Sequence, residues 1–150
     1  MSVRLSTEEA WNFIEGSQKG IFTTLRKDGS PVALPVWFVV IERTICIGAP
    51  TRTKKITRVR NDPRASFLVE SGLRWAELEA VHLNGVAAVV EDKALKEQIE
   101  EALDVKYEQM RTAADLMPTA TRDHYSVTTY LRLVPQDEPL SWNNRNLGIM

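Results

Sequence analysis

Residues 20–41 read GIFTTLRKDGSPVALPVWFVVI and carry the strongest architectural signal in the chain. Alternate residues from Ile21 to Leu25 would share one side of a strand. Asp28-Gly29 then supplies a tight turn, because glycine tolerates a positive φ angle. Apolar residues fill both faces of the next strand, Val32–Ile41. This stretch predicts a β-hairpin whose second strand is covered on both faces, one of them by a ligand or a second subunit.

The flanking sequence extends this hairpin into a small antiparallel barrel. Further strands are expected at Thr44–Ala49, Ala65–Glu70, Glu79–Glu91 (with a bulge at Gly85) and Ser126–Val134. Helices are expected from the capping box Ser6–Glu9 to Gly16, within residues 50–64, and from Asp92 to Met110. Residues 71–78 and 112–125 would be loops, the second with a short helix at most, and the tail would be irregular. Six strands with two to three peripheral helices indicate a mainly β (α+β) fold.

Length and composition set outer limits on the function. With 150 residues, 43% hydrophobic and 26% charged, residues 1–150 are expected to form one domain. The single cysteine, Cys46, lies in an apolar run, which predicts a buried thiol and fits a reducing compartment. The polar N-terminus and the short apolar runs predict a cytoplasmic protein without a membrane span. A net charge of −1 argues against a general nucleic-acid binder.

One segment departs from this near-neutral balance. Residues 50–64 read PTRTKKITRVRNDPR and carry six cations: Arg52, Lys54, Lys55, Arg58, Arg60 and Arg64. Thr53 could cap a short helix there, so that its backbone N–H groups and the hydroxyls of Thr51 and Thr53 meet an anion, with Lys54 and Lys55 adding charge. The segment predicts a phosphate anchor for a cofactor. A basic helix that is simply solvated is an equally open interpretation.

The other residues that could carry out chemistry give little support for a catalytic or metal site. His82 lies in a strand and His124 in a loop, and neither has a predicted catalytic partner. No clustered Cys/His spacing predicts a metal site, and neither a P-loop nor a Gly-x-Gly-x-x-Gly pattern occurs. If the protein is an enzyme, a bound organic cofactor must therefore supply the difficult chemistry, and no catalytic side chain is assigned.

Three runs of sequence, in order, resemble a known family. GIFTTLRKDGSPVALPVWFVV, KKITRVRNDPRASFLVE and VHLNGVAAVVED are similar to the pyridoxamine 5′-phosphate oxidase-like split β-barrel superfamily, of the FMN-binding split-barrel type. Within it, the chain looks most like the flavin/deazaflavin oxidoreductases that bind coenzyme F420. The tail SWNNRNLG, residues 141–148, is similar to a closing motif of that branch, with Asn143 where the branch has aspartate. The resemblance implies a six-stranded antiparallel split barrel.

The resemblance also implies roles for particular residues. Lys54 and Lys55 would hold the cofactor phosphate. Further along the segment, Arg58, Arg60 and Arg64 would face only water or the acidic tail of the coenzyme. The strand Pro35-Val36-Trp37 would lie against the tricyclic ring. Trp142 and Arg145 would reach the site from the same chain or from a partner, because family members are homodimers with the cofactor between subunits.

The leading function is therefore an F420-dependent reductase that transfers a hydride to or from a small organic substrate. An FMN-binding oxidoreductase and a non-catalytic flavin- or deazaflavin-binding protein are the alternatives, and a haem-binding split barrel is a more distant one. Residues 71–78 and 112–125 are expected to line the acceptor pocket. Arg74 and Trp75 would either meet an acceptor or cover the barrel rim, and we favour the second.

Overall fold

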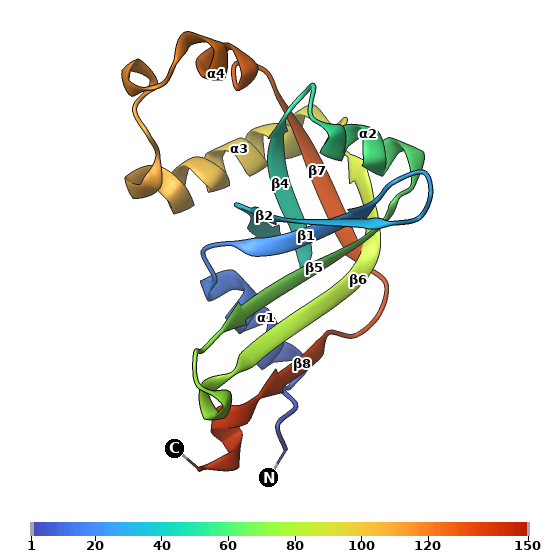
Figure 1. The fold of residues 1–150 in the computed structure, drawn as a ribbon, viewed down its shortest axis with the longest axis vertical. Helices are drawn as coiled ribbons and strands as arrows, with labels where there is room; N and C mark the ends of the chain where they lie inside the picture. Colours follow the sequence, from blue (N-terminus) through green and yellow to red (C-terminus); the bar gives the residue numbers. More distant parts are fainter. Residues whose placement is uncertain (1, 150) are drawn as a thin grey trace.

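The computed structural model describes residues 2–149, which build one curled antiparallel sheet with helices around it (Figure 1). The strand order is β2-β1-β5-β6-β7-β4-β3, and β8 pairs with β6. The strands are β1 Gly20–Leu25, β2 Pro31–Val36, β3 Val39–Ile41, β4 Thr44–Pro50, β5 Arg64–Ser71, β6 Glu79–Val89, β7 Thr128–Pro135 and β8 Leu140–Asn143. The expected split β-barrel is confirmed.

Four α-helices and four short 3-10 turns surround the sheet in the described part of the chain. The α-helices are α1 Thr7–Gly16, α2 Lys54–Asn61, α3 Lys93–Tyr107 and α4 Thr119–His124. The 3-10 turns are Trp75–Glu77, Glu108–Met110, Ala114–Leu116 and Asn144–Leu147. The expected helix 92–110 thus ends as an α-helix at Tyr107. Across residues 2–149, no helix combines the length and apolarity needed to cross a membrane.

Several short sequence patterns adopt the local structures that they predict. The Ser6 hydroxyl accepts a hydrogen bond from the Glu9 amide at 3.1 Å, and the Glu9 carboxylate accepts one from the Ser6 amide at 3.0 Å. This capping box starts α1, which buries Trp11 and Ile14 against the barrel. The turn between β1 and β2 holds Gly29 at a φ of 86°. Each of these structures depends on contacts within a few residues, which explains why the pattern predicts them.

Two apolar clusters stabilise the sheet, one on each side of β4. The barrel interior includes Ile45 and Ile47 with residues from the other strands, α1 and α2. The second cluster lies between β4 and α3, where fully buried Cys46 packs with Ile99 and Tyr107. The thiol is buried as expected, and this burial raises its pKa.

The expectation of one continuous strand over residues 32–41 is wrong. The chain breaks at Trp37-Phe38, so that β2 pairs with β1 while β3 pairs with β4. These two strands lie at opposite ends of the sheet order. The chain therefore crosses at Trp37-Phe38 from one end of the sheet to the other, and the alternating apolar pattern continues through the crossing without revealing it.

Two side chains at the end of α3 satisfy the backbone at this crossing. The Tyr107 hydroxyl accepts a hydrogen bond from the Phe38 amide at 2.9 Å. Its single proton can go to the carbonyl of Gln18 at 2.7 Å or of Phe38 at 3.0 Å. The Lys106 amine also donates to the Phe38 carbonyl, at 2.9 Å, and burial lowers its pKa to about 8 despite the opposing charge of Glu15. These bonds replace the ladder partners lost at the crossing.

The expectation of a bulge at Gly85 is also wrong. The pairing of β6 with β5 runs through Gly85 without a shift in register, and the pairing with β7 begins at Gly85. A Cβ atom at this position would lie 2.3 Å from the carbonyl oxygen of Val134 on β7. Glycine is therefore required by the close approach of the neighbouring backbone rather than by an extra residue in the strand.

The tail is not irregular as expected. It forms β8, which pairs with the first half of β6, and a 3-10 turn follows. The N-terminal segment lies alongside: the Asn143 amide donates to the Val3 carbonyl at 2.7 Å, and the Leu5 amide donates to the Ser141 hydroxyl at 3.0 Å. The first and last described segments thus lie at the same end of the molecule, opposite α2 (Figure 1). The divided strand and β8 account for the eight strands where six were expected.

We expect Tyr107→Phe to lower the free energy of unfolding by about 1–3 kcal/mol, because it removes the partner of the buried Phe38 amide. Urea denaturation would measure the change. Tyr125→Phe is the matched control, since Tyr125 is 59% exposed, and it should change stability by less than about 0.5 kcal/mol. Equal stability of Tyr107→Phe and the parent protein would contradict the role given to the hydroxyl.

Candidate functional site

The N-terminus of α2 leaves a polar side chain without a partner. Thr53 has the extended backbone of an N-cap residue, but its side chain caps no amide. Its hydroxyl is buried and has no hydrogen-bond partner among the described residues. The first amides of any helix also lack partners within the helix. An unpaired buried hydroxyl beside such amides is the arrangement expected of an anion site that a ligand completes.

Lys55 adds a desolvated charge to this helix end. Its side chain is half-buried, whereas that of Lys54 is exposed. Within residues 2–149, Lys55 forms no ion pair with a carboxylate. Burial lowers its pKa, and the positive charge of Arg58 lowers it further. The folded chain thus holds a cation at a free-energy cost that an anionic ligand would offset.

Arg58 belongs to the same cationic cluster. Its Nε donates a hydrogen bond of 2.7 Å to the hydroxyl of Thr24, a buried residue of β1. Burial lowers the pKa of Arg58, and the charge of Arg26 lowers it further. The interpretation that Arg58 faces only water or a coenzyme tail is therefore wrong. Its position three residues after Lys55, on the same face of a helix, was the available sequence signal.

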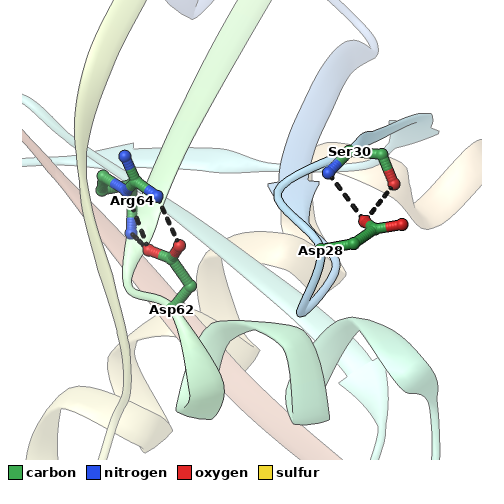
Figure 2. A network of polar contacts seen from close by, with 4 residues as sticks. All are labelled: Asp28, Ser30, Asp62 and Arg64. Atoms are coloured by element: carbon green, nitrogen blue, oxygen red, sulfur yellow. Dashed lines mark hydrogen bonds and ion pairs between the residues drawn. The ribbon is translucent and has the colours of Figure 1, made fainter.

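Figure 2 shows two carboxylates, those of Asp62 and Asp28, that are already engaged by neighbouring groups. Asp62 forms an ion pair of 2.8 Å with Arg64, which removes Arg64 from the anion site. Asp28, in the turn after β1, accepts hydrogen bonds from the amide and the hydroxyl of Ser30, at 2.9 and 2.6 Å. Neither carboxylate pairs with Lys55 or Arg58. Arg26, Lys55 and Arg58 are here called the cationic cluster. The charge of Arg26 acts on the Asp28 carboxylate, but three cations against one carboxylate still leave an excess of positive charge.

The remaining residues of the basic segment lie around this cluster. The Thr51 hydroxyl is 2.8 Å from that of Thr129 on β7, and the Thr51 amide donates to Val127 at 3.0 Å. These contacts fix the turn that leads into α2. Arg60 is exposed on the far part of the helix. Thr53 and Lys55 are therefore the predicted anchor residues that this arrangement favours most.

The strand predicted to lie against a cofactor ring is only partly covered. Pro35 and Trp37 are exposed, whereas Val36 is buried. Leu34 beside them is 43% exposed, so the apolar surface expected to be covered is open in the single chain. Trp37 stacks on Tyr107 with ring centroids 4.4 Å apart. A ligand or a second subunit covering this surface stays a prediction.

A groove of about 490 Å³ connects Trp37 to the start of the basic segment. It lies between β4, β7, α3 and residues 110–128, and Pro50 lines its end. The Pro50 carbonyl accepts a hydrogen bond from the Thr53 amide at 3.0 Å, so the groove adjoins the N-terminus of α2. The 112–125 segment contributes to its wall, and the binding of an acceptor there stays a prediction. Residues 71–78 instead contact the tail, through a bond of 2.8 Å from Asn144 to Trp75.

Trp142 and Arg145 lie far from the basic segment in the same chain. Trp142 is opposite Ala80 in the β6–β8 pairing, and the charge of Arg145 acts on the carboxylate of Glu79. Figure 1 places β8 and α2 at opposite ends of the molecule. One chain therefore does not bring these predicted site residues together, and a second subunit would have to do so.

No metal centre is evident in the described part of the chain, where no three His, Cys, Asp or Glu side chains cluster suitably. His82 is half-buried on β6 and His124 is exposed beside Tyr125. Neither histidine lines the groove.

Comparison with known proteins supports the fold and identifies a family. The sequence model of pyridoxamine 5′-phosphate oxidase matches residues 6–128. No curated protein matches the sequence.

Solved structures also resemble the chain. A conserved hypothetical protein from Mycobacterium tuberculosis is 27% identical, with a TM-score of 0.83 over 99% of this chain and 91% of that one. A FAD-binding protein from Mycobacterium smegmatis is 21% identical, with a TM-score of 0.68 over 93% and 98% of the two chains. A haem storage protein from Vibrio cholerae is 13% identical, with a TM-score of 0.71 over 95% and 96%.

We expect Lys55→Met to raise the free energy of unfolding by up to about 1 kcal/mol at neutral pH, after discounting for solvent that still reaches the amine. The pKa of Lys55 is lower in the folded chain than its ordinary value of 10.5. Its destabilising effect is therefore complete below the folded pKa and fades as pH rises from there toward the unfolded pKa. Urea denaturation of both proteins at several pH values would measure this.

Arg60→Met is the control for this substitution, because Arg60 is exposed on the same helix and should change stability by less than about 0.5 kcal/mol. Added pyrophosphate should stabilise the parent protein and Arg60→Met more than Lys55→Met. Stabilisation by pyrophosphate that is equal in all three proteins would contradict an anion site at Lys55.

Proposed function

The chain belongs to the pyridoxamine 5′-phosphate oxidase family, and from this premise we propose that it is an oxidoreductase that binds coenzyme F420 by its phosphate at α2. The observation that carries the proposal is the half-buried, unpaired Lys55 beside the buried hydroxyl of Thr53, which has no partner among the described residues. A phosphate would satisfy both groups and the first amides of the helix at once.

The residues present fit the phosphate end of such a cofactor. Thr53, Lys54 and Lys55 would hold the phosphate, and the open strand Pro35–Trp37 would support the ring. When bound, the reduced deazaflavin would supply a hydride and a proton to an organic acceptor, which gains both. The chain itself would orient the ring and exclude water, and no side chain is required to act as acid or base.

FMN is the second candidate cofactor, because both molecules carry a ribityl phosphate that the same anchor would hold. The FAD-binding protein from Mycobacterium smegmatis has a similar fold, and this similarity supports a flavin-type ligand. The tail, residues 141–148, favours the deazaflavin by its similarity to that branch. A carrier without turnover is the third candidate. Oxidation of the reduced cofactor on adding quinones or enones would exclude the carrier.

A homodimer with the cofactor between subunits is part of the proposal. Leu34 and Trp37 leave an apolar surface open in the single chain, at 43% and 40% exposure. Trp142 and Arg145 could reach a cationic cluster only across a subunit boundary, given their position at the far end of their own chain (Figure 1). A dimer would account for both features.

We expect Lys55→Ala to weaken F420 binding by about tenfold to a hundredfold, since a charge-assisted contact contributes roughly 1.5–3 kcal/mol. Fluorescence titration of the cofactor would measure the affinity, and a parallel titration with FMN would rank the two ligands. Arg64→Ala is the control, because Arg64 is already paired with Asp62, and it should change affinity less than about threefold. Unchanged affinity in Lys55→Ala would remove the phosphate anchor from the proposal.

Mixing two variants that are each expected to bind the cofactor poorly tests the subunit arrangement. If Trp142 reaches the partner's site, Lys55→Ala and Trp142→Ala should each bind poorly as homodimers. A heterodimer of the two would contain one site with both native residues, so unfolding and refolding them together should restore tight binding at up to about a quarter of all sites. Co-refolding each variant with itself is the control. No recovery, with both variants folded and dimeric, would place Trp142 outside the site.

A further inference from the structure

Residues 112–126, here called the strap, arch between α3 and β7 along one side of the groove (Figure 1). Three of them, Thr112, Met117 and Tyr125, line the groove. Because the groove runs from the N-terminus of α2 to Trp37, it is the space that the proposed cofactor would occupy between its phosphate and its ring. A bound cofactor would therefore lie directly beside the strap.

The strap packs weakly against the rest of the chain. Within residues 2–149, each hydrogen bond that the strap forms joins two of its own residues. All its residues are exposed except Met117, which is half-buried. Its helix, α4, has six residues and its 3-10 turn has three, so neither is long enough to be stable without tertiary contacts. A segment of this kind opens at little cost in free energy.

Both ends of the strap are fixed, each beside one end of the groove. On the α3 side, Arg111 forms an ion pair of 3.1 Å with Asp104, and its guanidinium carbon lies 5.8 Å from the centre of the Trp37 ring. On the β7 side, the Val127 carbonyl accepts hydrogen bonds from the amide and the hydroxyl of Thr51, at 3.0 and 3.2 Å. Weak packing between two fixed ends is the arrangement expected of a segment that closes on a ligand.

We propose that the strap closes over the groove when the cofactor binds, and that Met117 and Tyr125 then pack on the bound molecule. In the free chain Tyr125 is 59% exposed, and a ligand in the groove would supply the apolar surface that this ring lacks. Closure would exclude water from the ring of the cofactor and slow its release. The identity of the ligand rests on the proposed function, whereas the weak packing and the fixed ends do not.

Hydrogen exchange of the full chain, followed by mass spectrometry, tests this. The strap amides should exchange rapidly in the free protein, and saturating F420 or FMN should slow them by about tenfold or more. Pyrophosphate, which would occupy the phosphate anchor alone, should leave the exchange of the strap unchanged. The turn at Glu42-Arg43 is the internal control, because neither residue lines the groove, and it should exchange equally in all samples.

Two neighbouring residues of the strap provide matched variants. Met117 lines the groove, whereas Leu116 does not and is 74% exposed. Met117→Ala should speed the dissociation of the cofactor by about tenfold, because it removes an apolar contact that closure buries. It should also reduce the protection of the strap amides. Leu116→Ala should change neither quantity. Stopped-flow fluorescence of the cofactor would measure the dissociation rates.

Fluorescence titration of the cofactor separates this inference from the proposed function. Binding of F420 or FMN without slower exchange in the strap would overturn closure and leave the proposed function standing. Strap amides that are already protected in the free protein, or equal dissociation rates in the two alanine variants, would also overturn closure alone. Failure of both cofactors to bind would overturn the proposed function, and closure with it.

Discussion

The hydroxyl of Tyr107 joins the two ends of the sheet. It bonds to Gln18, just before β1, and to Phe38, where the chain passes from β2 to β3. β2 and β3 lie at opposite ends of the strand order. The Tyr107 hydroxyl therefore fixes α3 beside the point where the chain crosses from one end of the sheet to the other. The stacking of Trp37 on Tyr107 then fixes one end of the groove, and the position of α3 places Glu100 and Asp104 along its wall. The Trp37 end of the groove depends on this contact.

The same end of the molecule carries two opposite electrostatic environments. Lys55 and Arg58 in the cationic cluster are desolvated charges that form no ion pair with a carboxylate among the described residues, which costs stability in the absence of an anion. The groove beside it holds an excess of negative charge next to aromatic rings. Pro50 lies at the boundary, since it lines the groove and its carbonyl accepts the Thr53 amide.

Local patterns made much of the fold predictable, and long-range contacts account for what was missed. The capping box at Ser6 and the turn at Asp28-Gly29 depend on neighbouring residues alone. The break at Trp37-Phe38 depends on a tyrosine about seventy residues later, and the need for Gly85 on a carbonyl of β7. In the site, the basic segment predicted that Thr53 and Lys55 belong to a phosphate anchor. The partner of Arg58 on β1 and the acidic groove could not be inferred, because each joins distant elements.

The position of β7 in the chain has a consequence for folding. This strand pairs with both β4 and β6, yet α3 and α4 separate it from β6 along the chain. Until β7 docks, β4 and β6 each keep an unpaired edge, the kind of surface that recruits other strands. Because this pairing has to overcome the entropy of closing a long loop, we expect the docking of β7 to be a slow step and the one most exposed to aggregation.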